Sequence, residues 1–178
     1  ASIGHNELPS GIIPNRNAYL ILAASDAGYS KIMMGVLHGE INSDKSIEFM
    51  SDMQAMLDIS WRKQYWNKEE RIHKIWSPIR DYTKTQLVRL YLDLGGDPAV
   101  LLRTVSCYSA EHQHCGACPS CFKRWVALIN NHINQSWAAH PLDWKEVPSI
   151  INKIKDGTYS KQRAEEITKA LTIADRRM

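Results

Sequence analysis

Apolar residues recur every three or four positions in six segments of the chain, a spacing that predicts amphipathic helices. The predicted helices cover residues 17–27, 43–57, 83–94 and 122–133, and two segments after residue 143 that are separated at Asp156-Gly157. Ser43 or Asp44 can cap the second helix. Thr83 can cap the third helix, and Gly95-Gly96 stops it.

Two short apolar runs between these helices predict strands. Residues 32–37 form a continuous apolar run after a helix, which is typical of a buried parallel strand, and a second strand is predicted at residues 73–78. Helices alternate with these strands and then continue alone, so the pattern predicts an α/β fold with a helical C-terminal extension. Two strands do not make a stable parallel sheet. We therefore expect chain outside these 178 residues, or another subunit, to complete the sheet.

Composition and charge exclude several classes of protein. The hydrophobic share of 44% and charged share of 23% are ordinary for a globular chain, and the net charge of +3 does not by itself indicate nucleic-acid binding. Residues 61–91 carry eight basic against three acidic side chains, with Trp61, Trp66 and Trp76 interleaved. No apolar run is long enough to span a bilayer, and no secretory leader is evident. These features predict a cytoplasmic protein without a membrane partner.

The four cysteines lie within 15 residues, in the order Cys107, Cys115, Cys118 and Cys121. The C-x2-C-x2-C run with a fourth cysteine upstream lets four thiolates surround one metal ion. Gly116 allows a tight turn between ligands, and a helix starting near Cys121 favours thiolate at its first turn. Four protein ligands leave no position for water, so the pattern favours a structural zinc ion over a catalytic one.

Three other interpretations of the cysteines are two disulfides, an iron–sulfur cluster and inert buried thiols, of which the last is unusual for four clustered residues. Two disulfides would require an oxidising compartment, and the chain is not a small cysteine-rich domain. An iron–sulfur cluster also uses C-x2-C-x2-C, although its fourth cysteine usually lies downstream. His112 or His114 could replace one thiolate as a ligand.

Several motifs occur in a shared order over roughly residues 12–127. They are Ile13-Pro14-Asn15-Arg16-Asn17, Met34-Gly35-Val36, Thr83-Lys84, Leu94-Gly95, Ser106-Cys107-Tyr108, Cys115-Gly116-Ala117-Cys118 with Cys121, and Arg124. In order and spacing this set resembles the 7-cyano-7-deazaguanine synthases of queuosine biosynthesis. The resemblance implies part of a doubly wound α/β sheet of the adenine-nucleotide alpha-hydrolase-like (PP-loop) type, carrying a zinc loop and a helical C-terminal extension.

The resemblance also implies an activity and a set of cofactors. Enzymes of this family adenylate the carboxylate of 7-carboxy-7-deazaguanine with ATP, add ammonia and dehydrate the amide to the nitrile, with magnesium on the nucleotide and a structural zinc ion. By resemblance, Arg16 and Asn17 lie near the nucleotide and Lys84 near the active cleft. Asp44 could offer its carboxylate to the edge of a base. The sequence identifies no catalytic residue.

The chain departs from the family pattern in two ways that affect function. The pyrophosphate loop Ser-Gly-Gly-x-Asp-Ser does not occur in residues 1–178. We expect that loop on a second polypeptide or on a cleaved N-terminal half. The stretch Gly-Tyr-Pro-Asp-Cys-Arg, which faces the deazapurine in the family, is not kept after Val36. The small-molecule base substrate is therefore not identified.

These features predict three parts of the chain. Residues 1–103 would be the C-terminal portion of the PP-loop domain, residues 104–133 the zinc loop and its helix, and residues 134–178 a helical extension. The alternative to an enzyme is a catalytically silent, zinc-stapled module that contacts a partner protein or nucleic acid. A homo-oligomer is compatible with either interpretation.

Overall fold

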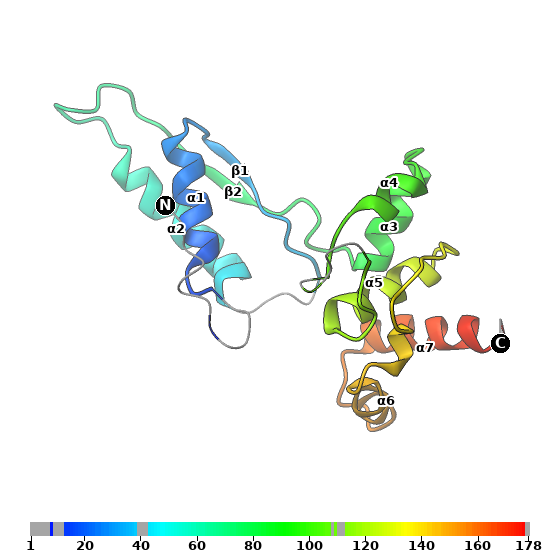
Figure 1. Cartoon of the computed structure of the whole chain (residues 1–178). Helices are drawn as coiled ribbons and strands as arrows, with labels where there is room; N and C mark the ends of the chain where they lie inside the picture. The colour runs from blue at the N-terminus through cyan, green and yellow to red at the C-terminus, as the bar shows by residue number, and fades with distance from the viewer. Residues whose placement is uncertain (1–7, 9–12, 39–42, 108, 110–112, 177–178) are drawn as a thin grey trace. The chain divides into compact units, whose positions relative to one another are not determined.

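The structure is a computed structural model that describes residue 8 and residues 13–38, 43–107, 109 and 113–176 (Figure 1). The chain forms two compact units, Ala1–Asp81 and Tyr82–Met178. The domain boundaries expected near residues 103 and 133 stay predictions. Within the described ranges, no helix has the length and apolar character needed to cross a membrane.

The first unit contains two helices and two strands in alternating order. Its elements are α1 (Arg16–Asp26), β1 (Lys31–Met33), a short 3-10 helix (Ser43–Lys45), α2 (Ile47–Ser60) and β2 (Lys74–Trp76). The strands pair in parallel, with Lys31 opposite Lys74 and Met33 opposite Trp76. The predicted order of helices and strands and the parallel pairing are thus confirmed. A doubly wound sheet is not, because the described residues form a sheet of two strands.

The first strand is shorter than the expected run over residues 32–37. Its last ladder bond joins the backbone N–H of Met34 to the carbonyl of Trp76. The partner strand β2 is followed by Ser77 and Pro78, and proline has no N–H with which to extend the ladder. Beyond Met34 the contact between the two segments comes from a side chain instead, as the Ser77 hydroxyl donates to the carbonyl of Val36 at 2.7 Å.

Within the described part of this unit, one face of the small sheet is covered and the other is not. Ile75 of β2 packs in a core with three residues from α1 and α2, which are Ile21, Met50 and Leu57, and Ile32 of β1 lies against the same core. On the opposite face Met33 is 66% exposed. Within the described residues the strand is therefore exposed on this face, because both helices lie on the other side of the sheet; the completed sheet stays a prediction.

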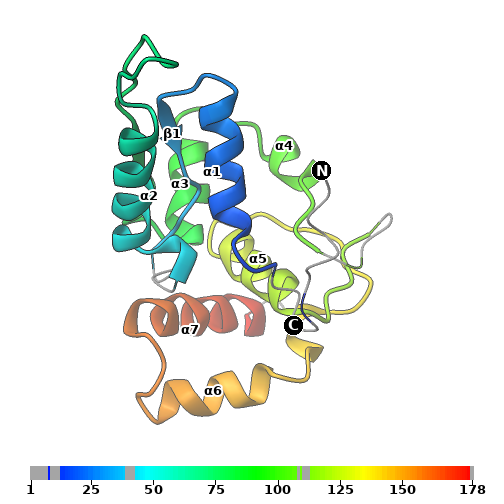
Figure 2. The same ribbon diagram turned by 90° about the vertical axis from the view of Figure 1, so that its left-hand side faces the viewer.

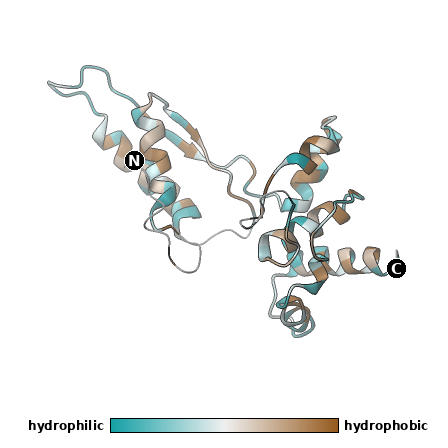
Figure 3. Cartoon of the chain, viewed as in Figure 1, coloured by the Kyte–Doolittle hydropathy of each residue, from teal (hydrophilic) through white to brown (hydrophobic). Residues whose placement is uncertain are grey.

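Two helix details also differ from the sequence predictions. The cap of α2 is Ser46, whose hydroxyl accepts the N–H of Phe49 at 2.9 Å, and not Ser43 or Asp44, which lie in the preceding 3-10 turn. On α1 the buried positions are Ile21 and Ser25. Figure 3 shows apolar residues along this helix, yet Tyr19 and Leu20 are exposed, so the apolar spacing alone did not indicate which side faces the core.

The second unit is entirely helical in its regular elements (Figure 2). They are α3 (Lys84–Asp93), α4 (Pro98–Arg103), α5 (Pro119–Ile129), a 3-10 turn (Pro141–Asp143), α6 (Val147–Lys155) and α7 (Lys161–Asp175). Thr83 caps α3 in a capping box with Gln86, as the sequence predicted for this helix start. The apolar spacing did not predict α4, although Asp97 followed by Pro98 is a typical cap and first residue of a helix.

The core of the second unit surrounds α5. Phe122, Trp125, Val126 and Ile129 of this helix pack against Val147 of α6 and against Ile167 and Ala170 of α7. The helix begins at Pro119, three residues earlier than predicted, and it ends at Ile129 rather than at residue 133 because the chain leaves the helix near His132, whose φ is 59°. The C-terminal helices predicted on either side of Asp156-Gly157 are confirmed as α6 and α7.

Candidate metal centre

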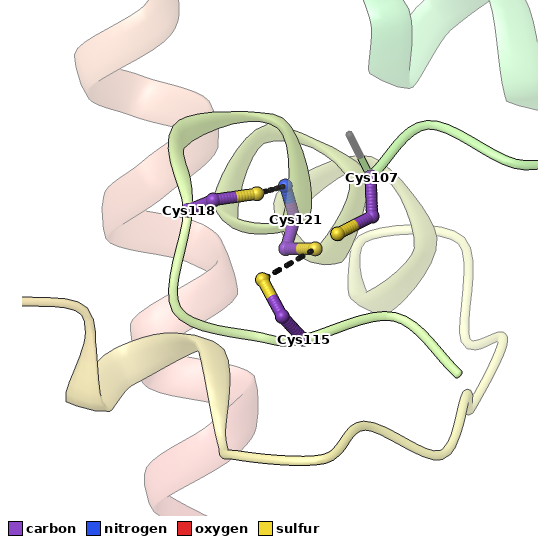
Figure 4. A group of neighbouring side chains, drawn as sticks. All are labelled: Cys107, Cys115, Cys118 and Cys121. Carbon is purple, nitrogen blue, oxygen red and sulfur yellow. Dashed lines mark hydrogen bonds between the residues drawn. The ribbon is translucent and has the colours of Figure 1, made fainter. Parts of the chain in front are cut away.

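The four cysteines converge at the start of α5 (Figure 4). Cys107 lies in the segment after α4, and Cys115 lies in the loop before α5. Cys118 is the N-cap of α5, and Cys121 lies in its first turn. Their four sulfur atoms all lie within 4.8 Å of one another. The structure thus brings together every thiol that the sequence pattern grouped.

The spacing of the sulfur atoms fits one tetrahedral ion. A zinc–sulfur bond of about 2.3 Å places neighbouring sulfurs about 3.8 Å apart in a tetrahedron. The Sγ atoms of Cys115 and Cys121 are 3.9 Å apart. All four cysteines are free. The cluster therefore has the geometry of a metal site rather than of two disulfides, and four thiolates suit zinc.

The environments of the thiols differ in electrostatics. Burial raises the pKa of Cys118 and Cys121 above the usual thiol value. Burial would also raise the pKa of Cys107, but hydrogen bonds from the Ser109 hydroxyl and from the backbone N–H groups of Cys115 and Ser109 lower it to about 6. A thiolate is therefore easiest to form at Cys107. A divalent cation would supply the charge that stabilises thiolates at the more buried sulfurs.

The backbone of the loop is shaped for this convergence. Cys118 Sγ accepts the N–H of Cys121 at 3.4 Å, so one ligand also caps the helix. Gly116 has a φ of 75°, a conformation that residues with a Cβ rarely adopt. A Cβ on Gly116 would lie 1.6 Å from the carbonyl oxygen of Ala139, so the loop also needs glycine for close contact. The tight turn predicted at Gly116 is confirmed.

The histidines of the loop do not join the cluster in the described residues. His112 and Tyr108 lie outside the residues that the structure describes. His114 is buried, its Nε2 accepts the backbone N–H of Ser106 at 3.2 Å, and its Nδ1 lies 3.0 Å from Gln135 Nε2. Nε2 is thus engaged by Ser106, and a neutral ring that accepts there carries its proton on Nδ1, which lies in close contact with Gln135. Burial, with the nearby positive charge of Arg124, lowers the pKa of His114 and favours the neutral ring.

Arg124 of α5 is a buried cation close to this cluster. Its guanidinium donates to the carbonyl of Leu101 at 2.6 Å, to Thr104 Oγ1 at 2.8 Å and to Gln135 Oε1 at 2.7 Å. Burial lowers the pKa of Arg124, and the negative charge of Cys121 opposes that effect. The sequence comparison had included Arg124 as part of a motif without giving it a role.

The residues expected near a nucleotide fall in both units. Arg16 and Asn17, at the start of α1, line a pocket of about 460 Å³ together with residues of β1 and the turn after it. Asn17 Nδ2 donates to the backbone carbonyl of Asp44 at 3.1 Å, so the structure brings these two residues together. Lys84 begins α3 in the second unit. The roles of these residues stay predictions.

A buried chain of polar side chains in the first unit was not found by sequence reasoning. Ser25 Oγ lies 3.0 Å from His73 Nε2, and His73 Nδ1 lies 3.1 Å from Asp58 Oδ1. This is the order of groups in a hydrolase triad. Ser25 is 0% and His73 2% exposed, so no substrate reaches the hydroxyl. We interpret these three side chains as a structural link that joins α1, α2 and His73, the residue before β2.

Parallel strands alternating with helices, together with a cluster of four thiols that could hold a metal ion, define the class of α/β protein to which the chain belongs. Comparison with known proteins identifies the family. The family model described as queuosine biosynthesis protein QueC matches residues 1–132. The chain belongs to this family, and the resemblance found in the sequence is confirmed. No solved structure matches the chain at a significant level.

The chain is similar to several curated proteins named 7-cyano-7-deazaguanine synthase. The relative from Prochlorococcus marinus (strain MIT 9312) is 26% identical over 133 residues, which are 68% of this chain and 57% of the relative. The relative from Synechococcus sp. (strain CC9311) is 30% identical over 128 residues, 68% of this chain and 54% of the relative. The relative from Rickettsia africae (strain ESF-5) is 27% identical over 136 residues, which are 72% of this chain and 57% of the relative. The chain thus spans little more than half the length of these relatives.

Proposed function

We propose that this chain is the C-terminal part of an ATP-dependent enzyme similar to 7-cyano-7-deazaguanine synthase. Its reaction would be adenylation of a carboxylate on a 7-deazapurine or related base, followed by formation of the amide and the nitrile. The phosphate-binding loop would come from outside these 178 residues, on a second polypeptide or a cleaved N-terminal half. The family match over residues 1–132 supports this activity most directly.

The pocket at the start of α1 supports the position of the nucleotide. Arg16 and Asn17 lie in the first turn of α1, where backbone N–H groups lack partners within the helix. Among the described residues of that turn none is acidic, and the cap residue Asn15 makes no side-chain hydrogen bond to it. A helix start with a cation beside it favours a bound anion such as a phosphate.

The small sheet supports the position of the missing loop. In a parallel ladder alternate residues bond to opposite neighbours. Ser30 and Met34 bond to β2, so the backbone groups of Lys31 and Met33 point to the other edge of β1. No described strand pairs with that edge. A strand from the missing portion would pair there, the segments connected to it would cover the exposed face around Met33, and its pyrophosphate loop would lie beside the pocket.

The metals would have separate roles. A zinc ion on the four cysteines, in agreement with the sulfur geometry, would hold the loop before α5 in one conformation. A magnesium ion would bind with the nucleotide phosphates at the completed site. Free thiols at all four cysteines are compatible with a reducing, cytoplasmic location.

Pyrophosphate release tests the proposal. The purified 178-residue chain should release no pyrophosphate from ATP, and the complex with the polypeptide that carries Ser-Gly-Gly-x-Asp-Ser should release it when a 7-carboxy-7-deazapurine is present. Arg16→Ala should lower the activity of that complex, whereas Arg62→Ala, a change at an exposed arginine outside the pocket, should not. Pyrophosphate release by the chain alone, or none by the complex, would contradict the proposal.

A second candidate is binding of nucleic acid by the segment between α2 and β2. Tyr65 is 92% and Trp66 58% exposed, and basic residues flank them, in a sequence suited to base stacking. Internal hydrogen bonds hold the segment, including one from Asn67 Nδ2 to the carbonyl of Trp61 at 3.0 Å. Binding of a single-stranded oligonucleotide that is lost in Trp66→Ala would favour this function. If the segment contacts a partner protein instead, the chain should bind no oligonucleotide.

A further inference from the structure

Part of the segment after α5 lies against residues 113–116 of the cysteine loop. The backbone N–H groups of Ala138 and Ala139 donate to the carbonyls of His114 and Cys115, at 2.9 and 3.0 Å. Trp137 meets the ring of His114 edge-on, with ring centres 5.6 Å apart. The side chain of Gln113 donates to the hydroxyl of Ser136 at 2.9 Å. Residues 136–139 therefore form a wall along residues 113–116.

Gln135 connects this wall to both sides of the cluster. Its Oε1 accepts from Arg124 Nε at 2.7 Å, and its Nε2 lies 3.0 Å from His114 Nδ1. His114 directly precedes the cysteine at position 115, and its Nε2 accepts the backbone N–H of Ser106, which directly precedes Cys107. One side chain thus links the buried cation to the two arms of the loop that carry cysteines.

The charge of a filled site makes this link consequential. Four thiolates around a divalent cation leave an excess of negative charge in a partly buried place, and a fixed cation and N–H groups compensate it. Arg124 is that cation, and Gln135 accepts one of its hydrogen bonds. Residues 134–139 follow the part of the chain that the family model matches, which ends at residue 132.

We propose that Gln135 is a positioning residue of the metal centre and that residues 136–139 form its outer wall, so that retention of the metal and ordering of this segment depend on each other. Because linkage is reciprocal, removal of the metal loosens the wall as much as loss of the wall weakens metal binding. This inference concerns the metal site alone and does not rest on the proposed enzymatic activity.

Zinc release and hydrogen exchange of the full chain test the proposal. Loss of a partner that orients a metal ligand typically costs about 10–100-fold in metal affinity. Gln135→Ala should therefore release zinc to an excess of chelating dye about 10-fold faster than the unchanged protein. The matched control is Gln162→Ala on α7, whose amide contacts only the distant Gln86 in the contacts described, at 3.4 Å; its release rate should be unchanged.

Two further measurements separate positioning from packing. In the unchanged protein, stripping the zinc should speed amide exchange at Ala138 and Ala139, and leave the amides of α2 unaffected. In urea, Gln135→Ala should destabilise the zinc-loaded protein more than the metal-free protein. Equal rates of zinc release in Gln135→Ala and the control would overturn the proposal. So would equal destabilisation of the zinc-loaded and metal-free proteins, or amide exchange at Ala138 and Ala139 that does not change when zinc is removed.

Discussion

Replacing Ser25 by alanine tests whether the buried polar chain of the first unit stabilises the fold. His73 lies against Asp58 through Nδ1 and through its backbone N–H, so Nδ1 donates to the carboxylate and Nε2 needs a partner elsewhere. Ser25 Oγ, 3.0 Å away, is the partner that the described structure supplies. Ser25→Ala would leave Nε2 of a side chain only 2% exposed without a partner.

The magnitude follows from two opposing effects. A buried polar atom without a partner costs about 1–3 kcal/mol. Alanine favours a helix over serine by about 0.5 kcal/mol, which offsets part of that cost. The net loss should be about 1–2 kcal/mol, or roughly a 5–30-fold shift toward the unfolded unit. The matched control is Ser60→Ala on α2, where the hydroxyl donates to the carbonyl of Met56 at an exposed position and the change should stay within about 0.5 kcal/mol.

Native-state hydrogen exchange measures the effect in the correct unit. The free energy of opening is read from the amides of α1 and β2, the elements that contain or adjoin Ser25 and His73. Ser25→Ala should lower this free energy, while Ser60→Ala should not. An equal response to both substitutions would show that His73 finds another hydrogen-bond partner. The link between Ser25, His73 and Asp58 would then not stabilise the unit.

Four further predictions concern the second unit. Cys118→Ser should lower the zinc content from one ion per chain to none by elemental analysis, because serine can still cap α5 but is a poor zinc ligand; retention of zinc would contradict the four-thiol site. Arg124→Met, which removes three hydrogen bonds of a buried guanidinium, should cost about 3 kcal/mol or more in urea unfolding. The control Arg89→Met, at an exposed ion pair with Asp93, should cost less than about 0.5 kcal/mol of unfolding free energy. Equal losses in Arg124→Met and Arg89→Met would refute the stabilising role of the buried arginine. Zinc should be released to a dye as the pH falls, because protons compete for thiolates and burial raises the pKa of Cys121; pH-independent retention would argue against thiolate ligands. Thr83→Ala should lower the helicity of α3 seen by exchange and cost about 1 kcal/mol, and an unchanged exchange pattern would show that the capping box adds nothing.

Features that depend on neighbours in sequence were predictable from the sequence. Thr83 caps α3 through Gln86, three residues away, and the glycine after Asp156 separates α6 from α7. The cysteine pattern also acts over a short distance, since three of its ligands lie within seven residues. Such features need only local hydrogen bonds and the helical repeat, which the order of residues specifies directly.

Features that depend on distant neighbours were decided by the tertiary structure. Ser25 and His73 are 48 residues apart, and nothing in the local pattern of either indicates that their side chains meet. The exposed strand face and the burial of Ile21 rather than its apolar neighbours depend on which helix packs where. Gln135 follows the last ligand by a full helix, yet it reaches Arg124 and His114 because the chain turns back after α5. Burial and long-range hydrogen bonding arise only when separate segments pack together, and this is why periodicity and spacing predicted the elements and the ligands but not the contacts that hold them in place.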